Sequence, residues 1–267
     1  MPETNAVIPL HQSTETQFEE PRRFKVFTAR QLDKIEPLKR LDDETRFAME
    51  VVANVLPFRV NEYVIDELID WDKVPNDPIY QLTFPQKGML APEHFDKVAE
   101  AMRGGDKAEI KAAIAEVREA LNPHPAGQME HNMPEVDGEK IDGVQHKYNE
   151  TVLFFPSQGQ VCHSYCTFCF RWAQFIGDND LKIATKEAGQ LKKYIQAHPE
   201  ITDVLITGGD PLVMKTKNLR AHIEPLLELE QIRTIRIGSK ALTFWPQRFV
   251  SDDDAQELLE LFQDVQA

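Results

Sequence analysis

The sequence contains very little cysteine: its 267 residues include three, Cys162, Cys166 and Cys169, all in one short segment. Because an odd number of cysteines cannot all pair within the chain, a framework of disulfide bonds is excluded. The start of the chain, Met1-Pro-Glu-Thr, also lacks the basic residues and the apolar run of an export signal. We therefore expect a cytoplasmic protein, in which the thiols stay reduced and serve a metal or redox site.

Two further absences limit the partners. No stretch of the sequence approaches the ~20 apolar residues that span a membrane. The formal net charge of -14 argues against nucleic acid or an anionic membrane, because both bind clustered lysine and arginine. Hydrophobic residues make up 42% of the chain, so a buried core is expected. The composition thus predicts a globular protein without a nucleic-acid or membrane partner.

The part of the chain before residue 146 predicts an arm followed by a helical region. Residues 1–22 are polar and aperiodic, which predicts a loose N-terminal arm. Residues 23–145 predict a helical region, since apolar residues recur at helical spacing over 28–58. The run 92–121, rich in Ala, Glu and Lys, predicts surface helices that break at residues 104–105, which are both glycine.

Residues 146–267 follow a different pattern, in which short apolar runs alternate with helical periodicity. The runs that predict buried strands are 152–155, 203–207 and 234–238. The helix after the first of them is expected to begin at Thr185, because threonine caps helix N-termini. Strands that alternate with helices form parallel βα units. The predicted fold class is therefore α/β, with three βα units after the helical N-terminal region.

The three cysteines have the spacing C-x3-C-x2-C, directly after the first predicted strand. Three thiolates on one loop can ligate three irons of a [4Fe-4S] cluster and leave the fourth iron open to a cofactor. One alternative is a structural zinc site with His163 or a distant histidine as fourth ligand, and another is three inert, buried thiols. Zinc sites generally contain two close pairs of ligands, and the sequence has no second pair, so the cluster is favoured.

A Gly-Gly-acid turn, Gly208-Gly209-Asp210, follows the second predicted strand. Together with the cysteine spacing, this turn resembles the radical S-adenosylmethionine (SAM) superfamily and, within it, the lysine 2,3-aminomutase family. The closer resemblance extends from residue 30 to the last residue. The other matching strings are Pro75-Asn-Asp-Pro78, His146-Lys-Tyr148, Val204 to Leu212, and Ile235-Arg-Ile-Gly-Ser239 through Pro246-Gln-Arg248.

The resemblance implies a partial radical-SAM (βα) barrel, with Cys162, Cys166 and Cys169 as cluster ligands. The residues that it implies for SAM are Phe168, Gly208, Gly209 and Asp210. Phe168 would pack near the adenine, with ordinary core packing as the alternative. The glycines would let the backbone approach SAM closely, with a plain β-to-α turn as the alternative. Arg171 matches the family arginine that pairs with the substrate carboxylate, a task that suits the planar guanidinium fork.

The family also uses pyridoxal 5′-phosphate (PLP), and the residues that match this site are Lys147 and Tyr148. Tyr148 matches a residue near the PLP phosphate, while Lys147 and Thr151 stand where the family has arginines. Two additional residues also separate Tyr148 from the first cysteine, so we expect phosphate binding to be weaker or rearranged. The implied activity is a radical isomerisation, in which a 5′-deoxyadenosyl radical drives an amino group from carbon 2 to carbon 3 of an amino acid.

The family's Schiff-base lysine and the acids that bind the distal amine of the substrate lie beyond Ala267, and the family has six βα units. We therefore expect a fragment, a truncated product, or a chain whose exposed sheet edge is covered by another chain. The alternative functions are a radical SAM protein without the amino shift and a noncatalytic iron–sulfur or interaction protein. The implied partners are an amino acid substrate, a reductant such as flavodoxin or ferredoxin, and a second copy of the chain.

Overall fold

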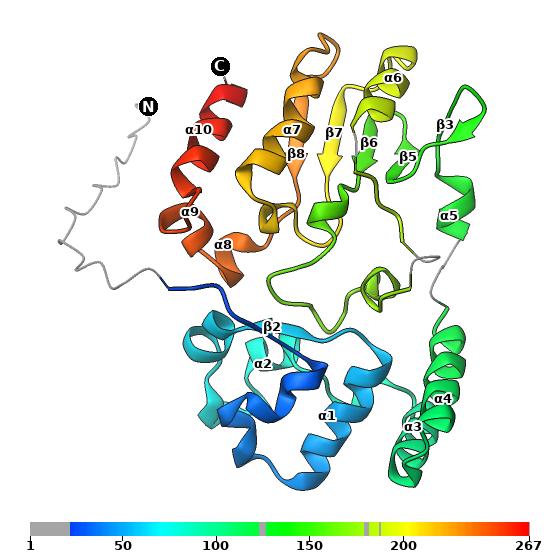
Figure 1. Cartoon of the computed structure of the whole chain (residues 1–267), viewed down its shortest axis with the longest axis vertical. Helices are drawn as coiled ribbons and strands as arrows, with labels where there is room; N and C mark the ends of the chain where they lie inside the picture. The colour runs from blue at the N-terminus through cyan, green and yellow to red at the C-terminus, as the bar shows by residue number, and fades with distance from the viewer. Residues whose placement is uncertain (1–21, 123–126, 179–181, 187, 267) are drawn as a thin grey trace, which may run out of the picture.

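Figure 1 shows a computed structural model of the protein, which describes residues 22–122, 127–178, 182–186 and 188–266. Apart from Arg22, the predicted N-terminal arm lies outside the described residues. The strands are β1 (Val26–Thr28), β2 (Arg59–Asn61), β3 (Glu135–Val136), β4 (Glu139–Lys140), β5 (Val144–Tyr148), β6 (Thr151–Phe154), β7 (Asp203–Ile206) and β8 (Thr234–Ile237).

The α-helices are α1 (Asp43–Val55), α2 (Pro78–Thr83), α3 (Pro92–Gly104), α4 (Lys107–Ala120), α5 (Gln128–His131), α6 (Gly189–Ala197), α7 (Thr216–Leu227), α8 (Ala241–Phe244), α9 (Gln247–Val250) and α10 (Ala255–Gln266). The short 3₁₀ or π segments are η1 (Ala29–Lys34), η2 (Glu36–Arg40), η3 (Val64–Leu68), η4 (Trp71–Lys73), η5 (Lys87–Met89), η7 (Ser157–Gly159), η8 (Trp172–Phe175) and η9 (Pro211–Val213). Within the described part of the chain, no helix has both the length and the apolarity to cross a membrane.

The N-terminal region is mostly helical and holds a small antiparallel ladder between β1 and β2. The helix predicted over 28–58 is confirmed only from Asp43, where Asp42 caps α1 by accepting a 2.8 Å hydrogen bond from the Thr45 N–H. Residues 29–40 instead form two 3₁₀ segments, because Ile35 is extended and Pro37 has no N–H for a continuing helix. The first part of the predicted helix was therefore wrong.

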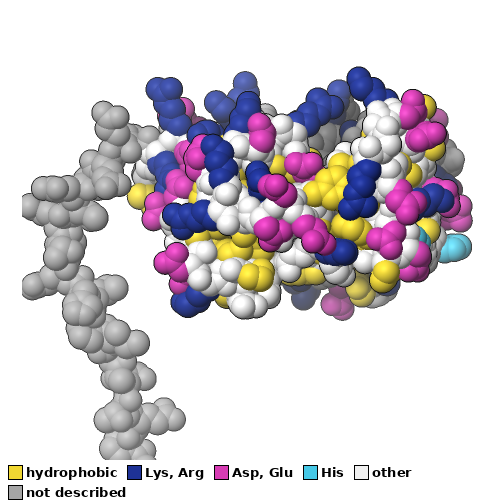
Figure 2. Space-filling view, turned by 90° about the horizontal axis from the view of Figure 1, so that it is seen from below, with side chains coloured by type: hydrophobic (Ala, Val, Ile, Leu, Met, Phe, Trp, Pro, Cys, Tyr) yellow, Lys and Arg dark blue, Asp and Glu magenta, His cyan; other side chains and the backbone are white. Residues whose placement is uncertain are grey.

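The helix pair α3 and α4 agrees with the predicted break at the two glycines. Gly105 ends α3 in the left-handed region, with a φ of 79°, and Asp106 caps α4 by accepting from the Ala108 and Glu109 N–H groups. Figure 2 shows the molecule from below, with acidic and basic side chains interspersed on the described residues of that face. Hydrophobic side chains lie between them, so this face is not a patch of one charge sign.

The main sheet has the strand order β5-β6-β7-β8, and β6, β7 and β8 are parallel as predicted. Strand β5 pairs antiparallel with β6 and was not predicted, because its residues 144–148 are mostly polar. The side chains of Val152, Val204 and Ile206 face α6, α7 and α10 and belong to one buried core cluster. The helices therefore cover one face of an open sheet, and no closed barrel forms within the described residues.

The other face of the sheet is exposed. In its register Leu153 of β6 lies beside Leu205 of β7, which lies beside Arg236 of β8. These residues, with Tyr148 and Thr151, line an open cavity of about 640 Å³. In a βα barrel the helices lie outside and the other face of the sheet is the interior. This face therefore corresponds to the interior of a barrel that does not close within the described residues.

The prediction that Thr185 caps a helix was wrong. Thr185 forms a parallel bridge with Pro156, and its backbone N–H donates to the Phe155 carbonyl at 3.0 Å. Helix α6 begins later, at Gly189, with Ala188 in the capping position. The backbone of Thr185 thus pairs with the segment that follows β6, and this residue does not begin a helix.

His222 on α7 gives a pH-dependent prediction. Its ring is buried against Phe154, with ring centroids 5.3 Å apart, and burial lowers its pKa below the ordinary value of 6.5. As the pH falls below 6.5, the unfolded chain takes up the proton that the buried ring resists, so stability falls. We expect the free energy of unfolding to fall more between about pH 7.5 and about pH 5.5 in the wild type than in His222→Gln. Urea denaturation at both pH values checks this, and parallel pH slopes would contradict it.

Candidate active site

The candidate site is a cavity of about 330 Å³ where the parallel strands end. Three loops line it, one after each of β6, β7 and β8, because the carboxyl ends of parallel strands meet at the same edge of a sheet. The main lining residues are Cys162, Cys166, Phe168, Cys169 and Arg171 from the first loop, Thr207, Gly208, Gly209 and Asp210 from the second, and Gly238, Ser239 and Lys240 from the third. The structure thus brings together all the residues that the sequence assigned to the cluster, to SAM and to the substrate carboxylate.

The cysteine side chains are partly buried and influence one another. Burial raises the pKa of the Cys162 thiol, and the nearby Asp210, Cys169 and Cys166 raise it further. The pKa of Cys169 is raised as well, first by burial. These thiols favour the protonated state until a positive ion replaces the protons. Three such donors around one cavity suit the thiolate ligation of an iron–sulfur cluster.

The zinc alternative fits this arrangement less well. In the ranges that the structure describes, no group of three or more His, Cys, Asp or Glu side chains is placed to hold a single metal ion. Thiolates on a cubane bind separate irons and need no common point. The ring of His163 is buried and turned toward Asp210, with 3.5 Å between Nδ1 and Oδ2, so it does not line the cysteine cavity. His163 is therefore not placed as the fourth ligand that the zinc alternative gave it.

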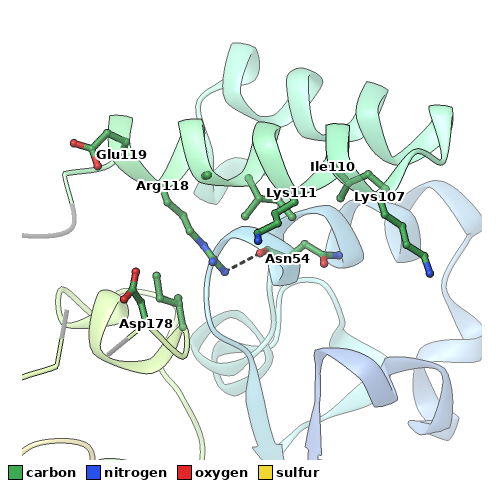
Figure 3. Close-up of a pocket in the computed structure, with 10 residues that line it drawn as sticks. Asn54, Lys107, Ile110, Lys111, Arg118, Glu119 and Asp178 are labelled. Carbon is green, nitrogen blue, oxygen red and sulfur yellow. Dashed lines mark hydrogen bonds between the residues drawn. The ribbon is translucent and has the colours of Figure 1, made fainter. Parts of the chain in front are cut away.

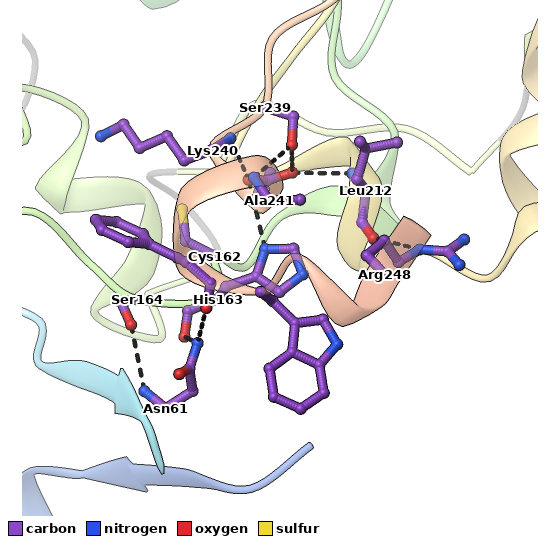
Figure 4. Close-up of polar contacts among 12 residues, drawn as sticks. Asn61, Cys162, His163, Ser164, Leu212, Ser239, Lys240, Ala241 and Arg248 are labelled. Atoms are coloured by element: carbon purple, nitrogen blue, oxygen red, sulfur yellow. Dashed lines mark hydrogen bonds and ion pairs between the residues drawn. The ribbon is translucent and has the colours of Figure 1, made fainter. Parts of the chain in front are cut away.

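The cysteine loop is held from outside by strand β2 of the N-terminal region. Arg59 Nε donates to the Cys162 carbonyl at 2.8 Å, and the Tyr165 N–H donates to the Arg59 carbonyl at 2.8 Å. Asn61, which is fully buried, donates through Nδ2 to the carbonyls of His163 and Phe244 (Figure 4). A segment about a hundred residues earlier in the chain therefore fixes the backbone of the loop.

The glycine turn is required by packing within the chain. Gly208 has a φ of 142°, and a Cβ on it would lie 2.1 Å from Gln160 Nε2. A Cβ on Gly209 would lie 2.5 Å from the backbone N and O of Val161. The prediction assigned these glycines to the close approach of a ligand. In the structure, the chain that approaches them is the base of the cysteine loop, so the turn is more than a plain connection between a strand and a helix.

Asp210 joins the three loops through its carboxylate, which contacts His163, Leu212, Ser239 and Lys240. Figure 4 labels these four partners. Oδ1 accepts from the Ser239 hydroxyl at 2.7 Å and from the Leu212 N–H at 2.9 Å, and Oδ2 accepts from the Lys240 N–H at 2.8 Å. Burial opposes ionisation, but His163 and these donors outweigh it and lower the pKa of Asp210. The side chain is therefore committed to positioning the loops. The backbone of Asp210 is engaged as well, since its N–H donates to the Val161 carbonyl at 2.8 Å and its carbonyl accepts from the Val213 N–H at 3.1 Å.

Replacing Asp210 with alanine is expected to lower the free energy of unfolding by about 1–3 kcal/mol, because the buried N–H of Leu212 and the partly buried N–H of Lys240 lose their acceptor. Urea denaturation measures the change. The exposed Asp253 provides a matched control, since Asp253→Ala removes a carboxylate at the surface. Equal stability of the two variants would contradict the role of Asp210.

Arg171 presents an unused donor in the cavity. Its Nη1 donates to the Gly208 carbonyl at 3.0 Å, and its guanidinium lies 4.3 Å from the centre of the Phe155 ring. Burial lowers its pKa to about 10, so the group is still cationic at neutral pH. Its Nη2 is buried and has no hydrogen-bond partner among the described residues. A buried, charged donor without a partner is unfavourable, so this atom indicates an anionic ligand.

For Phe168 the structure excludes one of the two predicted alternatives, and Lys240 is a site residue that the sequence did not indicate. Phe168 has 72% of its surface exposed, so the alternative that it packs in the core is wrong. Lys240 was not predicted at all, although its Nζ lies 2.5 Å from Cys166 Sγ and 5.4 Å from the centre of the Phe168 ring. The matching string from Ile235 through Arg248 includes this lysine, but no role was assigned to it.

The structure does not bring Lys147 and Tyr148 to the cysteine cavity. Both are exposed at the end of β5, near the start of β6, while the cysteine loop follows the end of β6. Tyr148 lines the open cavity on the exposed sheet face. Thr151 in the same cavity donates to Asp203 Oδ2 at 2.6 Å, and Arg236 pairs with the same carboxylate. The family's arginine at position 151 is thus replaced by a threonine that is engaged with an acid.

A further cavity, of about 580 Å³, lies between α4, the end of α1 and residues 176–178 (Figure 3). Its basic residues are Lys107, Lys111 and Arg118. Arg118 donates to the carbonyls of Val55 and Asn54, and so satisfies the end of α1. None of the residues predicted for the cluster, SAM or PLP lies in this cavity.

Comparison with known proteins gives three informative relatives. A protein of Aquifex aeolicus, provisionally named L-lysine 2,3-aminomutase, is 34% identical over 225 residues, which cover 84% of this chain and 50% of that protein. The L-lysine 2,3-aminomutase of Acetoanaerobium sticklandii is 31% identical over 50% of this chain and 32% of its own length. That of Methanococcus maripaludis is 23% identical over 79% of this chain and 40% of its own length.

The matched part spans about half, or less, of the length of each of these curated relatives. No protein-family model matches the chain.

Proposed function

This chain is homologous to the L-lysine 2,3-aminomutases, and on that premise we propose that it is a radical SAM isomerase of the aminomutase kind. It would bind a [4Fe-4S] cluster through Cys162, Cys166 and Cys169 and bind SAM in the cavity beside them. The amino acid substrate would lie in the same cavity, with its carboxylate on Arg171. The 2,3-amino shift itself is proposed from the names of the relatives.

The observation that carries the proposal is the convergence of three thiols, a glycine turn and an unpaired guanidinium on one cavity. Each group is suited to a different part of the chemistry. The thiols suit iron, and the Arg171 fork suits a carboxylate. When bound, the cluster would supply the electron that cleaves SAM into methionine and a 5′-deoxyadenosyl radical.

The residues of this chain would position the reactants for that step. The exposed ring of Phe168 offers an aromatic face for the adenine. Arg171 would orient the substrate, since its other nitrogen is already fixed on the Gly208 carbonyl. Asp210 would hold the three loops at a constant spacing around both molecules. Such positioning lets a reactive species meet one substrate atom instead of the solvent.

The described residues do not form a PLP site on their own, and we derive no step through PLP. Lys147 and Tyr148 lie on an open face, and Tyr148 is 57% exposed. The nearest guanidinium in that cavity, Arg236, is paired with Asp203. The proposal for PLP therefore depends on the resemblance, with Lys147 and Tyr148 as its phosphate contacts.

The proposal is tested by anaerobic reconstitution of the protein with iron and sulfide, followed by dithionite and SAM. We expect a brown protein with the absorption and electron paramagnetic resonance (EPR) spectra of a [4Fe-4S] cluster, and formation of 5′-deoxyadenosine. A protein that binds zinc and assembles no cluster would overturn the proposal. A cluster without SAM cleavage would favour the noncatalytic iron–sulfur alternative.

A further inference from the structure

The cysteine cavity contains two cationic side chains among its lining residues, Arg171 and Lys240. The proposed function places two carboxylates in the same cavity, one on the methionyl group of SAM and one on the amino acid substrate. Arg171 can form a bidentate pair with only one of these carboxylates. With two carboxylates and two cations in one cavity, the second carboxylate is left for Lys240.

Lys240 is held at its backbone and reaches across the cavity with its side chain. Its N–H donates to Asp210 Oδ2 at 2.8 Å, which fixes its position at the start of α8. Its Nζ lies 2.5 Å from Cys166 Sγ and 5.4 Å from the centre of the Phe168 ring. No carboxylate of the described residues pairs with this ammonium group, and the side chain is exposed to the cavity. The group is therefore positioned for an anion that lies next to the cysteines.

The two cations differ in the carboxylate that they suit. When a carboxylate chelates iron, one of its oxygens coordinates the metal. The remaining oxygen suits the point charge of a lysine ammonium group. A free carboxylate offers two oxygens, which match the parallel donors of an arginine. The resemblance to the radical SAM superfamily implies that the open iron chelates the methionyl amino and carboxylate groups of SAM, so the iron-bound carboxylate in the proposed complex would be that of SAM. Lys240 is the cation in contact with a cysteine sulfur.

We propose that Lys240 binds the carboxylate of the SAM methionyl group, which leaves Arg171 for the carboxylate of the substrate. This assignment rests on the proposed function. It makes the loop after β8 a third contributor to SAM binding, in addition to the cysteine loop and the Gly208-Gly209 turn. The side chain acts as a binding residue and takes no part in bond breaking.

The test measures SAM binding without turnover. SAM and its decarboxylated analogue, which lacks the carboxylate, are titrated into the cluster-loaded protein, and the change in the cluster EPR spectrum gives both dissociation constants. In Lys240→Met, we expect the affinity for SAM to fall about 10-fold, the low end for a charged hydrogen bond, because the site is exposed. The affinity for the analogue should hardly change, so the preference for SAM over the analogue also falls about 10-fold.

Two further variants make the test specific. Lys240→Arg keeps the charge and should restore most of the preference for SAM. Lys217→Met removes an exposed lysine from α7, outside the cavity, and should behave as the wild type. If Lys240→Met takes up less cluster, but the cluster that it holds shows the wild-type preference for SAM, Lys240 serves the cysteines only and the assignment is overturned. If the wild type takes up no cluster or gives no response to SAM, the proposed function itself fails.

Discussion

Replacing Cys166 with alanine is expected to abolish cluster assembly and SAM cleavage. The cavity offers three thiols for three irons, and the described residues include no fourth thiol that could take the place of a lost ligand. Loss of a partner of a metal ligand typically costs 10–100-fold, so loss of a ligand itself should lower cluster-dependent activity by more than about 100-fold. Iron and sulfide content after anaerobic reconstitution, together with 5′-deoxyadenosine formation, measures the effect.

Thr167→Ala is the matched control for the cysteine variant, because it lies in the same loop. Its hydroxyl donates to the Gln81 carbonyl at 2.9 Å, and the residue does not line the cysteine cavity. This variant should keep the cluster. If Cys166→Ala held a full complement of iron and cleaved SAM at the wild-type rate, the assignment of the three cysteines would be wrong.

The second large effect is expected for Gly209→Ala. The new Cβ would lie 2.5 Å from the backbone of Val161, and backbone atoms cannot yield as the end of a flexible side chain can. The base of the cysteine loop must then move away from the turn. We expect the free energy of unfolding to fall by about 2–3 kcal/mol, as for overpacking in a core. Because the moved loop bears the cysteines, iron content after reconstitution should fall as well.

Gly189→Ala is the control for this glycine variant. A Cβ on Gly189, the first residue of α6, would meet nothing within 4 Å. Alanine should therefore be neutral or slightly stabilising there, since it is the better helix former. Urea denaturation compares the two variants. Similar stabilities for both would show that the turn tolerates a side chain and that the loop is not held by close contact.

Much of the sheet could be predicted because its strands carry their own signal. The apolar runs in β6, β7 and β8 are buried under helices on one face, and the alternation of strands with helices indicated parallel pairing. Strand β5 has no such signal, because its residues 144–148 include Gln145, His146 and Lys147. It forms because β6 offers an unpaired edge, which is a property of the assembled sheet.

The candidate site was predicted as far as local motifs could indicate it. The cysteine spacing and the Gly208-Gly209 turn lie next to predicted strand ends, and parallel pairing brings strand ends together. Lys240 and the buried pair of His163 and Asp210 depend on how the third loop packs on the first. A single sequence does not contain that information. The comparisons confirm the resemblance to the lysine 2,3-aminomutases, but they bear on the roles of single residues only indirectly.

The contact of strand β2 with the cysteine loop has a consequence for cooperativity. Arg59 and Asn61 bind the backbone at Cys162 and His163, and Asn61 also binds the carbonyl of Phe244. The loop cannot open locally without breaking buried hydrogen bonds to the N-terminal region. Loop, α8 and β2 should therefore exchange their amide hydrogens as one foldon, with a protection well above that of an ordinary surface loop. The cysteine loop is then rigid through its partner strand, even though it contains little regular secondary structure of its own.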